Sequence, residues 1–104
     1  MKIEIPLPSG NILTVMRSYS YAPEGQDEST GEQKWVRSLV GRRYPRFHIY
    51  SRVSPDSTKA ILELHLDQKQ PSYEGSHAHS GEYDGPVVNR EAKRIEDITR
   101  GLSS

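Results

Sequence analysis

The chain contains four histidines, and all of them lie between positions 48 and 79. His65 and Asp67 occupy alternate positions of an expected strand and therefore share one face. His77 and His79 follow in the next loop. Imidazoles with a carboxylate form a competent ligand set for zinc, manganese or non-haem iron. The pattern predicts a divalent-metal site made of His65, Asp67, His77 and His79. In the alternatives, the histidines contact a bound ligand directly or are structural or solvated polar residues.

Two further side chains are candidates for catalysis. Glu82, in the same loop, can act as the general base of a metal-dependent hydrolase. Lys69 follows Asp67 by two residues, and together with Asp56 they match the loose written pattern of the PD-(D/E)xK nucleases. At about 3.3 Å per residue, Asp56 and Asp67 lie some ~25 Å apart at opposite ends of a hairpin, so one metal cannot bridge them. We therefore keep Asp67 and Lys69 as candidates and exclude Asp56.

A second group of candidates is basic and aromatic. Between Glu32 and Asp56 the chain has no acidic residue, but it has six lysines and arginines interleaved with aromatic rings. Arginine binds phosphates and stacks on bases, and exposed tyrosine or histidine rings are platforms for unpaired bases. The candidate ligand-binding residues are Arg46, His48, Tyr50, Arg52, His65 and Asp67. They predict a site for a phosphate-bearing ligand; the alternative is a solvated strand with paired arginines.

Two strands position these residues. Apolar and polar side chains alternate over Arg46–Val53 and again over Ala60–Asp67, which is typical of strands with one buried face. Between them, Pro55–Thr58 favours a four-residue loop that pairs Ser54 with Lys59.

This register assigns the side chains of both strands to faces. The opposed polar pairs are Arg46 with Asp67, His48 with His65 and Tyr50 with Glu63. The residues expected in the core are Phe47, Ile49, Leu62, Leu64 and Leu66. We expect the polar face to be exposed to solvent.

The remaining elements follow from the same kind of pattern. A strand over residues 2–7 and a second strand running from Leu13 to Tyr21 predict a hairpin. An acidic loop is expected over 22–33, a short helix with a capping box over 31–40, and a Gly-, Ser- and His-rich loop over 70–86. Apolar residues at helical spacing predict a C-terminal helix over 86–101.

These elements predict an α+β fold in the order ββ-α-ββ-α, with an antiparallel sheet that carries its helices on one face. A length of 104 residues predicts a single domain over 1–104.

Composition excludes several classes of protein. A formal net charge of zero argues against binding of polyanions by overall charge. The absence of cysteine excludes disulfides, thiolate metal sites and a cysteine nucleophile. No apolar run approaches the ~18 residues of a membrane span, so we expect no membrane partner. A soluble cytoplasmic protein is the prediction; the oligomeric state is not specified.

The segments HLDQK (residues 65–69) and AHSGEYD (residues 78–84) resemble those of short uncharacterised bacterial proteins, with candidate-phylum genomes among their sources. The likeness covers roughly residues 46–98. It implies a bacterial source, and it implies no activity, fold or catalytic residue.

The sequence therefore predicts a small binding module for a phosphate-bearing ligand, with single-stranded nucleic acid or a nucleotide as the favoured partner. Two alternatives stay open. One is a metal-dependent hydrolase with a His/Asp site, for which a divalent metal would be the cofactor. The other is a protein–protein interaction domain.

Overall fold

Strands of an antiparallel sheet and two helices make up the chain in this computed structural model, which describes residues 1–39, 41, 44–68, 81–82 and 85–103. In chain order the elements are β1 (Lys2–Pro6), α1 (Ile12–Ser18), β2 (Ala22–Gln26), β3 (Gln33–Ser38), β4 (Arg46–Val53), β5 (Lys59–Asp67), β6 (Gly81–Glu82) and α2 (Pro86–Ser103).

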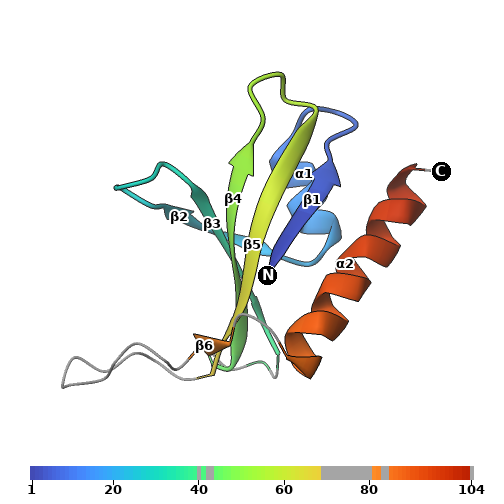
Figure 1. Cartoon of the computed structure of the whole chain (residues 1–104). Helices are drawn as coiled ribbons and strands as arrows, with labels where there is room; N and C mark the ends of the chain where they lie inside the picture. The colour runs from blue at the N-terminus through green and yellow to red at the C-terminus, as the bar shows by residue number, and fades with distance from the viewer. Residues whose placement is uncertain (40, 42–43, 69–80, 83–84, 104) are drawn as a thin grey trace.

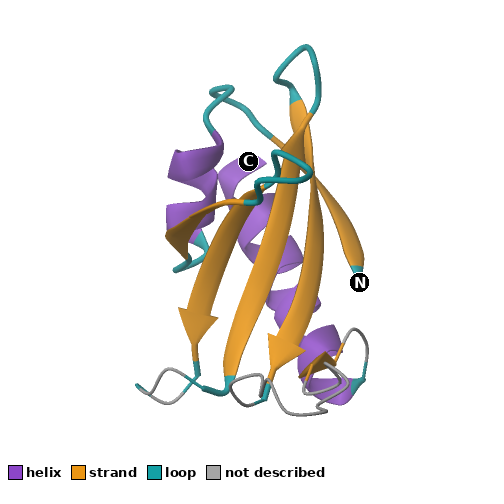
Figure 2. Ribbon diagram, turned by 90° about the vertical axis from the view of Figure 1, so that its left-hand side faces the viewer, coloured by secondary structure: helices purple, strands orange, loops and turns teal. Residues whose placement is uncertain are grey.

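The sheet has the strand order β1-β5-β4-β3-β2, and the two-residue β6 pairs with the end of β5. Strands β2 to β5 follow one another as antiparallel hairpins, and β1 returns to pair with β5. Both helices lie on the same face of the sheet (Figures 1 and 2). The predicted α+β class with helices on one face is therefore confirmed. The predicted order of elements is wrong, because a helix follows β1 directly and β2, β3, β4 and β5 then follow with no helix between them.

The first error concerns the segment after β1, where the expected second strand is helix α1. The side chain of Asn11 caps this helix, because its Oδ1 accepts hydrogen bonds from the backbone N–H groups of Leu13 (3.0 Å) and Thr14 (3.4 Å). The consecutive residues Val15 and Met16 are both buried, whereas a strand with one buried face buries alternate residues. Packing of both residues against the core therefore requires the helix.

The acidic loop expected over 22–33 and the helix expected over 31–40 are also wrong, since this region forms the β2–β3 hairpin. Trp35 has an exposed fraction of 2% and faces the core from β3. Its Nε1–H donates a hydrogen bond of 2.8 Å to Ser51 Oγ on β4. Thr30 caps no helix; it lies in the turn between β2 and β3. Burial of the indole ring by pairing with β4 outweighs the local helix signal.

The β4–β5 hairpin forms as predicted. The backbone N–H of Ser54 donates to the carbonyl of Lys59 at 2.9 Å, and all three predicted polar pairs are opposed across the two strands. The five predicted core residues of this hairpin are buried.

One apolar core fills the space between the sheet and the helices. Helix α2 contributes Val88, Ala92 and Ile95, all buried, and its observed range confirms the helix predicted over 86–101. Residues 81–82 of the predicted loop over 70–86 form β6, and most of the others lie outside the described residues. Neither helix has both the length and the apolar composition of a membrane span, as far as the described residues extend.

Candidate metal centre

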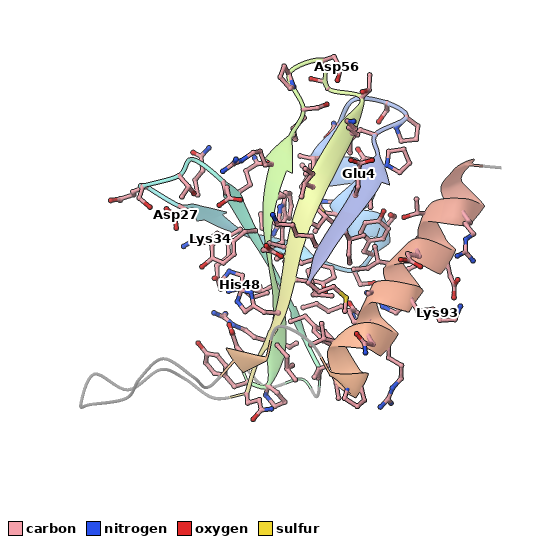
Figure 3. The ribbon with its side chains drawn as sticks, in the orientation of Figure 1. Glu4, Asp27, Lys34, His48, Asp56 and Lys93 are labelled. Atoms are coloured by element: carbon pink, nitrogen blue, oxygen red, sulfur yellow. The ribbon has the colours of Figure 1, made fainter. Side chains whose placement is uncertain are left out.

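Two histidines face each other on the side of the sheet that points away from the helices. Figure 3 shows His48 and Lys34 on this side, opposite to α2, which carries Lys93. His48 on β4 is paired with His65 on β5, and their ring centroids are 4.9 Å apart. Each of the two histidines has an exposed fraction of only 7%.

The expectation that this face is open to solvent is therefore wrong for both histidines. The ring of Tyr50 stacks beside His48, with 4.8 Å between centroids, and beside His65, with 5.6 Å. The side chains of Glu24, Arg46 and Asp67 crowd the same cluster. A polar surface of this kind is closed by its own side chains rather than covered by a helix.

The carboxylate of Asp67 lies between the two imidazoles. His48 Nδ1 is 3.4 Å from Asp67 Oδ2, and His65 Nε2 is 3.3 Å from Asp67 Oδ1. The ligand atoms of the three residues all lie within 4.8 Å of one another. A tetrahedral zinc ion with ligands at about 2.0–2.2 Å separates its ligand atoms by about 3.3–3.6 Å. The two contacts end on different oxygens of Asp67, so a carboxylate that binds through one oxygen supplies one such edge, and an ion would draw the remaining ligand atoms closer together.

Glu24 and Arg46 support this cluster from the side. Arg46 Nη1 is 2.5 Å from Glu24 Oε2, and Arg46 Nε is 3.6 Å from Asp67 Oδ2. The guanidinium thus lies between the two carboxylates, and its side chain is only 11% exposed. Glu24 Oε1 approaches the outer nitrogen of His48, Nε2, to 3.7 Å. This nitrogen is buried and has no hydrogen-bond partner among the described residues.

A β-bulge in β2 directs Glu24 to the site. Pro23 pairs with Trp35 and Gly25 pairs with Lys34, so Glu24 is the extra residue between two paired positions. Gly25 has a φ of 103°, a value that glycine adopts without strain. Bulges of this kind re-aim side chains next to functional sites.

The charge state of Asp67 suits a ligand. Burial alone raises the pKa of this carboxyl group, but hydrogen bonding and positive charge from His48 and His65 outweigh it and hold the pKa well below its usual value. The carboxylate is therefore ionised at neutral pH, as metal coordination requires.

The structure brings together part of the predicted metal site. His65 and Asp67 are adjacent as predicted, and the third member is His48, which the sequence predicted as a ligand-binding residue only. Lys69, His77 and His79 lie outside the described residues. Glu82 belongs to β6, and its backbone pairs with that of Leu66 on β5.

Two of the predicted ligand-binding residues lie elsewhere or play another part. Arg52 is four residues beyond His48 on β4, about 13 Å along the strand. Its side chain is 68% exposed and lies 4.0 Å from Glu32. Tyr50 belongs to the cluster through its ring. Sequence reasoning missed Glu24, although Pro-Glu-Gly in an extended segment is a signal for a bulge.

Comparisons with known proteins add no family to this geometry. No protein-family model matches the chain, and no curated protein has a matching sequence. The resemblance of residues 65–69 and 78–84 to short bacterial proteins stays a prediction.

Proposed function

We propose that this chain is a divalent-metal-binding domain whose ligands include His48, His65 and Asp67. The observation that carries this proposal is the spacing of the three side chains, with nitrogen–oxygen distances of 3.3 and 3.4 Å. Burial supports it, because two histidines with exposed fractions of 7% meet an ionised carboxylate. Buried charges are paired or coordinate metals, so a buried cluster of this composition is compatible with a bound ion.

Zinc is the ion that these donors favour. Two imidazoles and one carboxylate disfavour calcium and magnesium, because these ions prefer ligand sets made of oxygen atoms alone. The same donors form the facial triad of non-haem iron(II) proteins. The two nitrogen–oxygen contacts end on different oxygens of Asp67, so they do not fix the geometry of an ion. Zinc is tested first, because two histidines and a carboxylate hold zinc in known catalytic sites, and iron(II) is tested second.

The Glu24 carboxylate complements this assignment. With the metal on His48 Nδ1, the imidazole carries its proton on Nε2 and directs it towards Glu24 Oε1, 3.7 Å away. Carboxylates in this position orient metal-bound histidines and raise their basicity. Arg46 in turn holds Glu24 in place through the contact between its Nη1 and Oε2.

A hydrolytic activity is a further part of the proposal. Three protein ligands are the number found in catalytic zinc sites, where a water molecule takes the fourth position. The roles of Glu82 as general base and of Lys69, His77 and His79 stay predictions. A cytoplasmic location, which the absence of cysteine favours, also stays part of this proposal.

Binding of a nucleotide or single-stranded nucleic acid, the favoured prediction from sequence, receives less support. The Arg46 side chain is 11% exposed and contacts two carboxylates, so it is poorly placed to bind a phosphate. His48 and His65 are buried and offer no open platform for a base. Binding by Arg52 and Tyr50 stays a prediction.

The test is a titration of the metal-free full-length protein with zinc and, without oxygen, with iron(II), followed by calorimetry and thermal unfolding. At ~100 times its dissociation constant, a bound ion stabilises the native state by about 2.7 kcal/mol. For a domain of this size we expect the midpoint of unfolding to rise by roughly 10–20 °C. Cobalt(II) in place of zinc would report tetrahedral geometry through its visible absorption.

Three variants and one control locate the ion. We expect His48→Ala, His65→Ala and Asp67→Asn each to weaken zinc binding by more than roughly 100-fold. Loss of a residue that only supports a ligand typically weakens metal affinity by about 10- to 100-fold. Glu63→Gln, on the same face of β5 and outside the cluster, should bind zinc as the wild type does. Absence of binding by the wild type, or equal affinity in all four variants, would refute the proposal.

A further inference from the structure

A second candidate site lies on the opposite face of the sheet, where the first half of α2 meets β3. A cleft of about 270 Å³ opens here. Its charged lining consists of Arg37, Arg90, Glu91 and Arg94, and its apolar lining includes Leu39 and Phe47. None of these residues belongs to the proposed metal centre.

The arginines of the cleft outnumber its carboxylates. Glu91 is the one acidic residue in the lining, so three arginines against one carboxylate leave a local charge of +2. Arg94 binds Glu91 through two hydrogen bonds of 2.7 and 2.8 Å. Arg37 Nη1 lies 3.5 Å from Oε1 of Glu91, whose carboxylate already pairs with Arg94.

Arg90 adds a positive charge that no acidic side chain of the described residues pairs with. It is exposed on α2, one residue before Glu91, and makes no ion pair within the described part of the chain. Guanidinium groups bind carboxylates, sulfonates and phosphates through paired N–H donors. Arg37 and Arg90 therefore provide donors for an external anion.

The cleft also offers apolar surface beside these donors. Leu39 is 37% exposed, one of the two large apolar side chains that are exposed among the described residues. Phe47 is buried beneath, with its ring centroid 6.0 Å from the guanidinium carbon of Arg37. Apolar contact next to cationic donors suits a ligand that has both characters.

We propose that this cleft binds a small organic anion that joins one carboxylate, sulfonate or phosphate group to an apolar ring or short chain. The anionic group lies against Arg37 and Arg90, and the apolar part lies on Leu39 and Val87. The volume is slightly below the usual range of about 300–1,000 Å³ for ligand pockets, which restricts the ligand to a small molecule.

The probe for this proposal is naphthalene-2-sulfonate, which combines a ring system with an anion. We would titrate it into metal-free, isotope-labelled protein and follow amide and methyl resonances by NMR. Saturable shifts should be confined to the cleft, with Leu39 and Val87 among the affected residues. The uncharged naphthalene-2-sulfonamide should bind at least about ten times more weakly, because it lacks the charge that the arginines recognise.

Variants distinguish binding at this cleft from non-specific binding of the probe. Arg90→Gln, at an exposed position, and Arg37→Gln should each weaken binding of the sulfonate by about ten-fold or more. Arg52→Gln removes another exposed arginine, on the opposite face, and should leave binding unchanged. The proposal is overturned if no saturable binding occurs, if shifts spread over other surfaces, if the sulfonamide binds equally well, or if Arg90→Gln and Arg37→Gln bind as the wild type does.

Discussion

Replacement of Glu91 by alanine tests the buried polar cluster that joins α2 to the sheet. Glu91 is 4% exposed and accepts three hydrogen bonds, one from the Tyr21 hydroxyl at 2.7 Å and two from Arg94. Without the carboxylate, the hydroxyl of Tyr21, a residue that is 3% exposed, loses this acceptor, which costs about 1–3 kcal/mol.

Arg94 suffers less from the same change. Its Nη2 still donates to the carbonyl of Tyr19 at 2.6 Å, and its side chain is 30% exposed, so water solvates the rest of the guanidinium. The total is therefore expected at about 2–4 kcal/mol, below the upper end of the 3–5 kcal/mol that a broken, fully buried ion pair costs. For a domain of this length, this corresponds to a fall of roughly 10–25 °C in the unfolding midpoint.

Urea unfolding followed through the single tryptophan provides the assay. Trp35 is 2% exposed in the native state, so its emission changes when the sheet opens. The matched control is Glu96→Ala on the same helix, whose side chain is 55% exposed and lies 3.9 Å from Arg100. We expect this control to lose less than about 0.5 kcal/mol.

A double variant examines the cause of the loss. In Glu91→Ala with Tyr21→Phe, no hydroxyl remains without an acceptor, so the second substitution should cost nothing further or recover part of the stability. A Glu91→Ala variant as stable as Glu96→Ala, or a double variant in which the two losses simply add, would refute this account of the cluster.

Three further outcomes are expected. Leu64→Ala, at a position with no exposed surface, should lower the unfolding free energy by about 2–5 kcal/mol, and the half-exposed Ile61→Ala should cost clearly less; equal losses in urea would contradict the assigned faces. Burial, followed by the charge and hydrogen bond of Glu91, raises the pKa of Tyr21 above its usual value of 10.0. The neutral hydroxyl therefore contributes fully to the free energy of unfolding below pH 10, and this free energy falls as pH rises further. Tyr21→Phe should make the fall less steep by about 1.4 kcal/mol per pH unit, and an unchanged steepness would contradict this cause. Hydrogen bonds from neighbouring side chains lower the pKa of Asp56 to about 2. The stabilisation by this carboxylate is therefore complete above its unfolded pKa of 3.8 and is lost as pH falls through about 2. Asp56→Asn should be less stable than the wild type at pH 5, and the difference between their urea midpoints should shrink as pH falls to 2; a difference as large at pH 2 as at pH 5 would exclude this cause.

The parts of the fold that could be predicted are those whose signals are local. The two-residue alternation over β4 and β5, joined by the turn at Pro55–Thr58, determines both the register and the faces. The same register places His48 opposite His65, with Asp67 two residues further along β5, so the proximity of the three proposed ligands follows from the hairpin alone. Helix α2 follows equally from its apolar stripe.

The parts that were missed depend on contacts made far along the chain. Helix α1 has seven residues and is stabilised by the Asn11 cap and by packing of its buried side. Strand β3 is decided by pairing with β4, and the position of Glu24 is decided by the bulge in the pairing of β2 with β3. Such choices are tertiary, and local propensity does not contain them.

Glu91 is an omission that the sequence could have revealed. It lies three residues after Val88 and four before Ile95, within the apolar stripe of α2. A carboxylate at such a position needs buried partners. Two of these partners come from the segment after α1 and from β3, and their identity could not be predicted from the helix alone.

The connection of β1 determines the order in which the sheet can assemble and open. Strands β2 to β5 are consecutive hairpins that close short loops, whereas β1 must join Lys2 to Glu63 across most of the chain. Because long loops cost more entropy to close, β1 is expected to dock late in folding and to detach early. Amide hydrogens of Ile3 and Ile5 should then exchange through partial opening, with a smaller free energy than those of Ile49 and its neighbours. The hairpin that holds both clustered histidines can therefore stay folded while the edge of the sheet opens and closes.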